Sequence, residues 1–140
     1  MRRSALHLLH RAEQAADQLF LAGALGFITP RQLAVLIAVS EIEGGNLNYV
    51  VERTGIDRST TSEMVGRMAR MGLLQKRRSR RDTRSFVLRL TEEGRQLLDS
   101  ATPVARNIDA ALLRSLPPDR REPFLQALQA IVKGLEGQMV

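Results

Sequence analysis

Apolar residues recur along the chain with two different spacings, and each spacing predicts a different element. Spacings of three and four residues mark helical faces from Ser4 to Leu21, from Pro30 to about Ile42, from Asp57 to about Met71 and in two stretches after Thr91. Between Ser85 and Leu90 the apolar residues alternate, which is typical of a strand. The pattern therefore predicts a mainly α-helical protein with a small β-hairpin.

Residues suited to helix ends divide this pattern. Thr29, followed by Pro30, is typical of a helix start, and Asn46, Asp57 and Thr91 can cap three further helices. Gly55 suits the left-handed position that ends the short helix after Asn46. Two helices joined by residues 54–57 form a helix-turn-helix pattern.

The segment after this pattern is strongly basic. Residues 73–77 can pair with residues 85–90 as a hairpin, with residues 78–84 at its tip. Six of the nine residues 76–84 are basic and only Asp82 is acidic, in a chain with a net charge of +6 at pH 7. A basic hairpin next to a helix-turn-helix suits a phosphate backbone, so double-stranded DNA is the expected partner.

Length and composition exclude several other classes of protein and of site. A length of 140 residues predicts a single domain, and the absence of cysteine excludes disulfides and thiolate zinc sites. No apolar run approaches the ~18 residues that span a bilayer, so we expect a cytoplasmic, nucleoid-associated protein without membrane contact. Neither a nucleophile–base set nor a phosphate-binding glycine loop is evident, so we predict no enzyme activity and no cofactor.

The terminal segments, residues 1–24 and 92–140, carry apolar helical faces but are separated by the DNA-reading segment, residues 29–91. Alone they would form only a thin bundle. Packing against the same helices of a second copy would bury these faces. We therefore predict a symmetric homodimer that presents two reading helices to a palindromic operator.

Four short motifs, at residues 55–60, 71–74, 82–84 and 90–94, resemble those of the multiple-antibiotic-resistance regulator (MarR) family of winged helix-turn-helix repressors. The helix order outside them also fits, so the resemblance covers nearly the whole chain as one domain, residues 1–140. It implies a winged helix-turn-helix lobe with N- and C-terminal dimerisation helices. It also implies repression that is released when a small effector, often an aromatic or phenolic acid, binds between these parts.

The third helix of the lobe is expected to read DNA. With Thr61, Met64, Val65 and Met68 turned inward, short hydroxyl residues and arginines face outward and can approach bases and phosphates. An arginine of the hairpin can enter the neighbouring minor groove. The candidate DNA-binding residues are Arg58, Ser59, Thr60, Ser62, Glu63, Arg67, Arg78, Arg80, Arg81, Asp82 and Arg84.

Two acidic residues in this set have alternative interpretations. Asp82 either orients Arg81 or Arg84 or is a solvated turn residue, and the family resemblance implies a pair between Asp82 and Arg84. Glu63 can accept a hydrogen bond from cytosine N4, or it can pair with Arg67 four residues later. For Asp82 we favour the orienting role, and for Glu63 both interpretations stay open.

His7, His10 and Arg11 are candidate effector-binding residues by polarity and location. His7 and His10 are three residues apart and could bind a metal, but only Glu13 lies near them, so we predict no metal site. Two other functions remain open. A winged-helix module could bind RNA or an acidic protein, and a DNA-organising protein would bind duplex without sequence preference.

Overall fold

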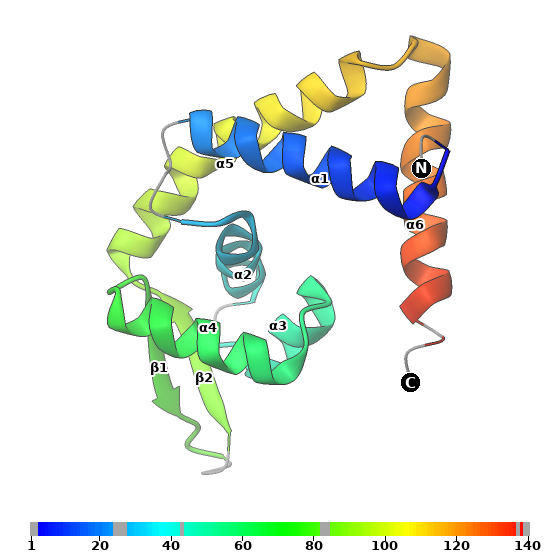
Figure 1. Ribbon diagram of the computed structural model, residues 1–140. Coiled ribbons are helices and arrows are strands. Elements are labelled where there is room, and N and C mark those ends of the chain that lie inside the picture. Colours follow the sequence, from blue (N-terminus) through cyan, green and yellow to red (C-terminus); the bar gives the residue numbers. More distant parts are fainter. Residues whose placement is uncertain (1–2, 24–27, 43, 82–84, 137, 139–140) are drawn as a thin grey trace. The chain divides into compact units, whose positions relative to one another are not determined.

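A computed structural model describes residues 3–23, 28–42, 44–81, 85–136 and 138. Within these ranges the order of elements is α1, α2, α3, α4, β1, β2, α5 and α6 (Figure 1). None of these helices is long and apolar enough to cross a bilayer. The chain divides into two compact units, residues 1–105 and 106–140.

The second helix begins at the predicted Pro30, and the first begins at Ala5, one residue after the predicted Ser4. Helix α1 spans Ala5–Ala22, and the Ser4 hydroxyl caps it by accepting a hydrogen bond from the His7 amide. Helix α2 spans Pro30–Glu41 and begins with a complete capping box. The Thr29 hydroxyl accepts from the Gln32 amide at 3.1 Å, and the Gln32 side chain accepts from the Thr29 amide at 2.9 Å.

The helix-turn-helix is confirmed. Helix α3, Leu47–Thr54, is capped by Asn46 and ends at Gly55, whose φ of 71° lies in the left-handed region that favours glycine. Helix α4, Arg58–Arg70, begins at the predicted cap Asp57. Strand β1, Leu74–Arg78, and strand β2, Phe86–Leu90, then pair antiparallel to form the hairpin, which we call the wing. Gly45 adds an isolated bridge to Leu88.

The core of the first unit surrounds α2. Large side chains that are almost completely buried come from α2, α3, α4 and β2, namely Val35, Leu36, Val50, Val65, Met68 and Leu88. Thr61 is buried among them, and its hydroxyl donates to the carbonyl oxygens of Ile56 and Asp57. The lobe therefore has its own hydrophobic core, and α4 contributes one face to that core and leaves the opposite face exposed.

Helix α5 spans Glu92–Arg114 and continues through Pro103. Thr91 joins it to the turn that precedes β1, because its hydroxyl donates to the Gly72 carbonyl at 2.6 Å and accepts from the Gly94 amide at 3.0 Å. In the second unit α5 turns at Leu116 into α6, Pro118–Glu136. There the Arg121 guanidinium donates to the carbonyl oxygens of Leu113 and Leu116.

Candidate nucleic-acid interface

Helix α4 presents a polar face. Ser59, Ser62, Glu63 and Arg67 are exposed, whereas Thr61, Val65 and Met68 on the opposite face are buried. Met64, which the sequence places inward, is only half-buried, and Thr60, which the sequence places outward, is half-buried as well. The spacing of these residues therefore predicts the two faces correctly, and Thr60 and Met64 lie on the boundary between them.

The first turn of α4 is fixed by Asp57. Its carboxylate accepts hydrogen bonds from the Thr60 amide at 2.9 Å and from the Thr60 hydroxyl at 2.7 Å. These bonds, the backbone one first, lower the pKa of Asp57, and the positive charge of Arg31 adds to the effect. The Thr60 hydroxyl therefore donates its proton within the protein, and only its oxygen lone pairs remain for a ligand.

Arg58 also has a partner within the lobe. Its guanidinium donates a hydrogen bond to the side-chain oxygen of Asn48, in the first turn of α3. This bond holds the Arg58 side chain between the N-terminal turns of α3 and α4. Sequence reasoning did not single out Asn48, because the contact joins two helices across the turn.

Glu63 and Arg67 form the ion pair that was one of the two interpretations of Glu63. The Arg67 nitrogen lies 3.7 Å from the Glu63 oxygen, one helical turn apart, and the side chains are 62% and 73% exposed respectively. An ion pair this exposed contributes little to stability. Both groups therefore remain available to a ligand that approaches α4.

Arg31 is a residue near this face that sequence reasoning missed. A cavity of about 220 Å³ lies between the first turn of α2 and the flank of α4. It is lined by Thr29, Arg31, Gln32, Thr60, Glu63, Met64 and Arg67. Arg31 is exposed and makes no hydrogen bond or ion pair with the residues that the structure describes. The sequence feature that could have pointed to Arg31 is its position directly after the helix start at Thr29 and Pro30.

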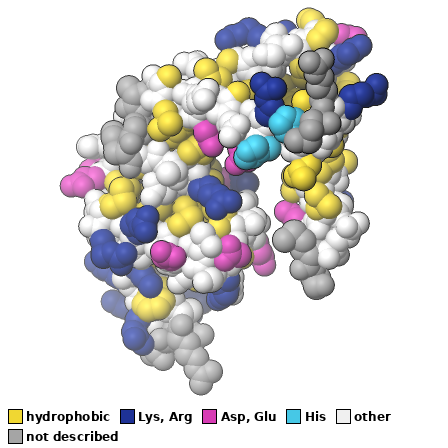
Figure 2. Space-filling model, in the orientation of Figure 1, with side chains coloured by type: hydrophobic (Ala, Val, Ile, Leu, Met, Phe, Trp, Pro, Cys, Tyr) yellow, Lys and Arg dark blue, Asp and Glu magenta, His cyan; other side chains and the backbone are white. Residues whose placement is uncertain are grey.

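The wing carries most of the predicted cations. Lys76, Arg77 and Arg78 are exposed on β1, and Arg80 and Arg81 are exposed at the tip. Figure 2 shows lysine and arginine side chains gathered over this part of the lobe. Asp82 and Arg84 lie outside the described residues, so the predicted pair between them stays a prediction.

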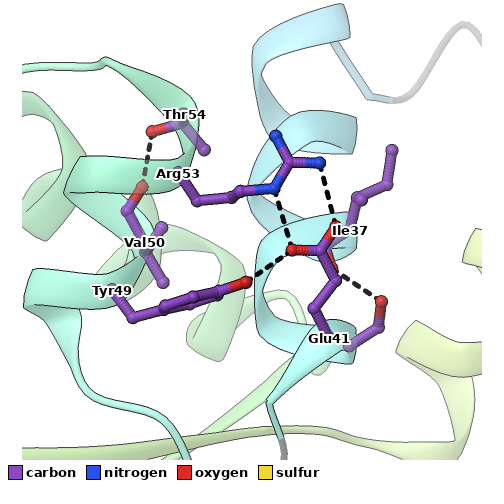
Figure 3. A network of polar contacts seen from close by, with 7 residues as sticks. Ile37, Glu41, Tyr49, Val50, Arg53 and Thr54 are labelled. Atoms are coloured by element: carbon purple, nitrogen blue, oxygen red, sulfur yellow. Dashed lines mark hydrogen bonds and ion pairs between the residues drawn. The ribbon is translucent and has the colours of Figure 1, made fainter.

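A polar network fixes α3 against α2 (Figure 3). The Glu41 carboxylate accepts two hydrogen bonds from Arg53, at 2.9 and 3.0 Å, and one from the Tyr49 hydroxyl at 2.6 Å. The bond from Arg53, followed by that from Tyr49, lowers the pKa of Glu41, and the same carboxylate raises the pKa of Tyr49. The network sets the position of α3, which in turn holds Arg58.

The candidate effector residues on α1 line neither the cavity beside α4 nor the larger cavity beside α1. His7 is half-buried, whereas His10 and Arg11 are exposed. The larger cavity beside α1, about 400 Å³, is lined instead by Glu13, Asp17, Leu21, Ile28, Thr29, Pro30 and Arg31. Among the described residues, no three metal-ligating side chains lie close enough together to hold a metal ion.

Comparisons with known proteins agree with this geometry. The model of the MarR family matches residues 28–85, which run from before α2 to the residue before β2. The HTH-type transcriptional repressor NicR of Pseudomonas putida is 28% identical over 127 residues, covering 90% of this chain and 80% of NicR.

Two solved structures extend the likeness to nearly the whole chain. The PcaV transcriptional regulator from Streptomyces coelicolor, in complex with its natural ligand, has a TM-score of 0.89 and 32% identity over 94% of each chain. BpsR of Bordetella bronchiseptica, whose DNA binding is regulated by 6-hydroxynicotinic acid, has a TM-score of 0.85 and 27% identity over 93% of this chain and 94% of BpsR. The relatives are regulators rather than enzymes, and the chain belongs to the MarR family of winged helix-turn-helix transcriptional regulators.

Proposed function

We propose that this protein is a homodimeric, sequence-specific transcriptional repressor in which each α4 enters a major groove of operator DNA. The observation that carries the proposal is the free polar face of α4, which lies on a closed lobe beside the basic wing. A helix of this size fits the major groove, and the wing then falls near the adjacent minor groove.

The residues have distinct roles in this arrangement. Ser59 and Ser62 are short and exposed, so they allow α4 to approach base edges, while Glu63 and Arg67 offer an acceptor and a donor for base pairs. Thr60, whose proton is held by Asp57, offers only an acceptor.

The arginines of the set are assigned to the DNA backbone and the minor groove. Arg58, held by Asn48, and Arg78, Arg80 and Arg81 of the wing bind phosphates. The sequence-based pair of Asp82 and Arg84 reaches the minor groove.

Exposed apolar side chains support the dimer. Helix α6 has no buried residue, and Phe124, Leu125, Ile131, Val132 and Leu135 are all exposed. Helix α1 exposes Leu6, at 81%, together with Leu8 and Leu9. Apolar faces of this extent are stabilised when a second copy covers them, and twofold pairing gives two reading helices about one turn of DNA apart.

A small aromatic acid is the proposed effector. BpsR responds to 6-hydroxynicotinic acid, and the cavity beside α1 in this chain contains Arg31, a cation that can pair with a carboxylate. His7, His10 and Arg11 on α1 are the sequence-based candidates for further contacts. Binding at α1 and α2 would favour a dimer with a different spacing of the two α4 helices and so release DNA.

The test is a footprint on the DNA upstream of the protein's own gene, with a random duplex and a structured RNA measured in parallel. A protected dyad with two half-sites about one helical turn apart is expected. Binding to random duplex with equal affinity would instead indicate a DNA-organising protein, and preference for the RNA would indicate an RNA-binding module. Sedimentation of Leu128→Asp, which should dissociate a dimer built on α6, tests the oligomeric state separately.

A further inference from the structure

Phe86 is the first residue of β2, and two cationic side chains lie near its ring. The Lys76 ammonium lies 4.2 Å from the ring centroid, and the Arg78 guanidinium carbon lies 5.7 Å from it. Both distances lie within the range in which a cation is attracted to the face of an aromatic ring. The ring is half-buried, whereas both cations are exposed.

The strand register explains why these three side chains meet. Arg78 pairs directly with Phe86, and Lys76 pairs with Leu88, so Lys76 is the diagonal neighbour of Phe86. Alternate residues of a strand share a face, so Lys76 and Arg78 lie on the same side of the wing as the buried residues Leu74 and Leu88. We call this side the inner face.

The other side of the wing differs in composition. Gln75, Arg77, Val87 and Arg89 alternate with the inner residues and therefore form the outer face. A substituent on Gly44 would contact Val87 and approach Arg89, so Gly44 lies on that side. Strand β1 contacts α4, and its buried residue Leu74 belongs to the inner face. The inner face is therefore the side of the wing that packs toward the lobe at Leu74 and Leu88, and Lys76 and Arg78 continue it along β1 as exposed side chains.

Two like charges drawn to one ring repel each other, and that repulsion is relieved when an anion binds between them. We propose that Phe86 is a positioning residue that holds Lys76 and Arg78 side by side on the inner face as a seat for one DNA phosphate. This inference rests on the proposed function, because it assumes that the wing meets duplex DNA. It adds Lys76 to the DNA-binding residues and assigns the inner face, rather than the outer one, to the backbone.

The experiment measures binding of the full-length protein to a random-sequence duplex, by fluorescence anisotropy, over about 50 to 200 mM salt. Phe86→Leu removes the ring but keeps an apolar side chain, and Phe86→Tyr keeps the ring. Phe86→Leu should weaken binding about two- to fivefold for each cation released from the ring. Its salt slope should fall by up to about 0.9, because one DNA phosphate is no longer neutralised, and Phe86→Tyr should restore both values.

A matched pair of charge deletions tests the assignment of the face. Lys76→Gln and Arg77→Gln each remove one positive charge from adjacent positions of β1, but only the first lies on the inner face. Lys76→Gln should lower the salt slope by about 0.9, and Arg77→Gln by less than half of that. The double variant Lys76→Gln/Phe86→Leu should lose less binding free energy than the sum of the losses in the two single variants.

The outcomes are distinct. The inference is overturned if Phe86→Leu keeps the wild-type salt slope and affinity. It is also overturned if Phe86→Tyr and Phe86→Leu lose the same affinity, or if Lys76→Gln and Arg77→Gln do. If Phe86→Leu loses its circular dichroism spectrum, the comparison of Lys76→Gln with Arg77→Gln decides alone. Failure of the wild-type protein to bind any duplex would instead remove the proposed function itself.

Discussion

The Asp57 carboxylate binds Thr60 twice, through the Thr60 amide at 2.9 Å and through the Thr60 hydroxyl at 2.7 Å. One residue of α4 is therefore held by the residue that caps that helix. Thr60→Ser keeps both bonds, whereas Thr60→Ala keeps only the amide bond and Asp57→Ala removes both. Because a lost N-cap loosens the first helical turn, Asp57→Ala should lower the melting temperature by a few degrees.

The same variants separate the two roles of Thr60 in DNA binding. If Thr60 acts mainly through the cap, Asp57→Ala should weaken binding to operator and random duplex alike, Thr60→Ala should weaken it less because it keeps the amide bond, and Thr60→Ser should bind normally. If the Thr60 oxygen also contacts a base, Thr60→Ala should lose operator affinity selectively. Fluorescence anisotropy with both duplexes measures the difference. If all three variants bind both duplexes as tightly as the wild type does, neither role matters.

Glu63 places a negative charge on the face of α4 that we propose meets DNA. Glu63→Gln removes this charge and releases Arg67 from an ion pair that is mostly exposed. We expect the affinity for random duplex to rise by roughly two- to fivefold at low salt, because one phosphate repulsion disappears while stability hardly changes. Selected binding sites should then change at the position where Glu63 accepts from cytosine, if that interpretation is correct.

Glu52 offers the control for this experiment. It is also an exposed carboxylate of the lobe, but it lies on α3 rather than on α4. Glu52→Gln should raise the affinity less than Glu63→Gln does. A gain of the same size in both variants would attribute the effect to net charge alone and would remove Glu63 from the interface.

The network at Glu41 predicts how stability responds to acid. Bonds from Arg53 and Tyr49 hold the pKa of Glu41 below its value in the unfolded chain, which is about 4.5. The network's contribution is therefore complete above that value and is lost as the pH falls through the lower folded pKa. Thermal unfolding between pH 7 and 3 should show this loss in the wild type.

Variants of the network isolate its part of the acid response. Glu41→Gln should be less stable at pH 7 by a few degrees in melting temperature and should show a flatter decline below pH 4.5, because it no longer titrates. Tyr49→Phe removes one hydrogen bond to Glu41, so its melting temperature at pH 7 should lie between those of the wild type and Glu41→Gln. A Glu41→Gln profile parallel to that of the wild type would assign the acid response to other carboxylates, of which Asp57 is the first to test.

Local signals in the sequence predicted most of the lobe. Thr29, Asn46, Asp57 and Thr91 all cap the helices that they were expected to cap, since a cap contacts a backbone amide only three residues away. Strand β1 begins at Leu74 rather than Leu73, because its ends depend on pairing with β2 rather than on its own residues.

Contacts between elements were not predictable in the same way. Arg53 meets Glu41 across twelve residues, and Arg58 meets Asn48 across ten, so both pairs depend on how α3 packs. The place of Arg31 in the cavity beside α1 likewise depends on how α1 packs beside the start of α2, while His7, His10 and Arg11 stay predictions. Charge and periodicity indicated the candidate interface, but the partners of its arginines required the packed structure.

Gly94 marks the place where α5 begins against the turn that precedes β1. A Cβ atom added to it would lie 2.1 Å from the Leu73 carbonyl oxygen, closer than any real contact, and that atom belongs to the backbone. The same oxygen accepts a hydrogen bond from the Thr91 amide at 3.1 Å. Gly94→Ala must therefore separate α5 from β1 or break that bond, and we expect it to cost about 1–3 kcal/mol of stability, as overpacking does.

Gly134 is the control for this prediction, because it also lies inside a helix but has nothing within 4 Å of an added Cβ. There alanine should be neutral or stabilising by up to about 1 kcal/mol, since it favours the helix more than glycine does. Urea unfolding of both variants measures the contrast. Since Thr91 links α5 through Gly72 to the turn that precedes β1, Gly94→Ala should also weaken DNA binding. Equal stability of the two variants would mean that the approach of α5 to Leu73 is not a constraint on this fold.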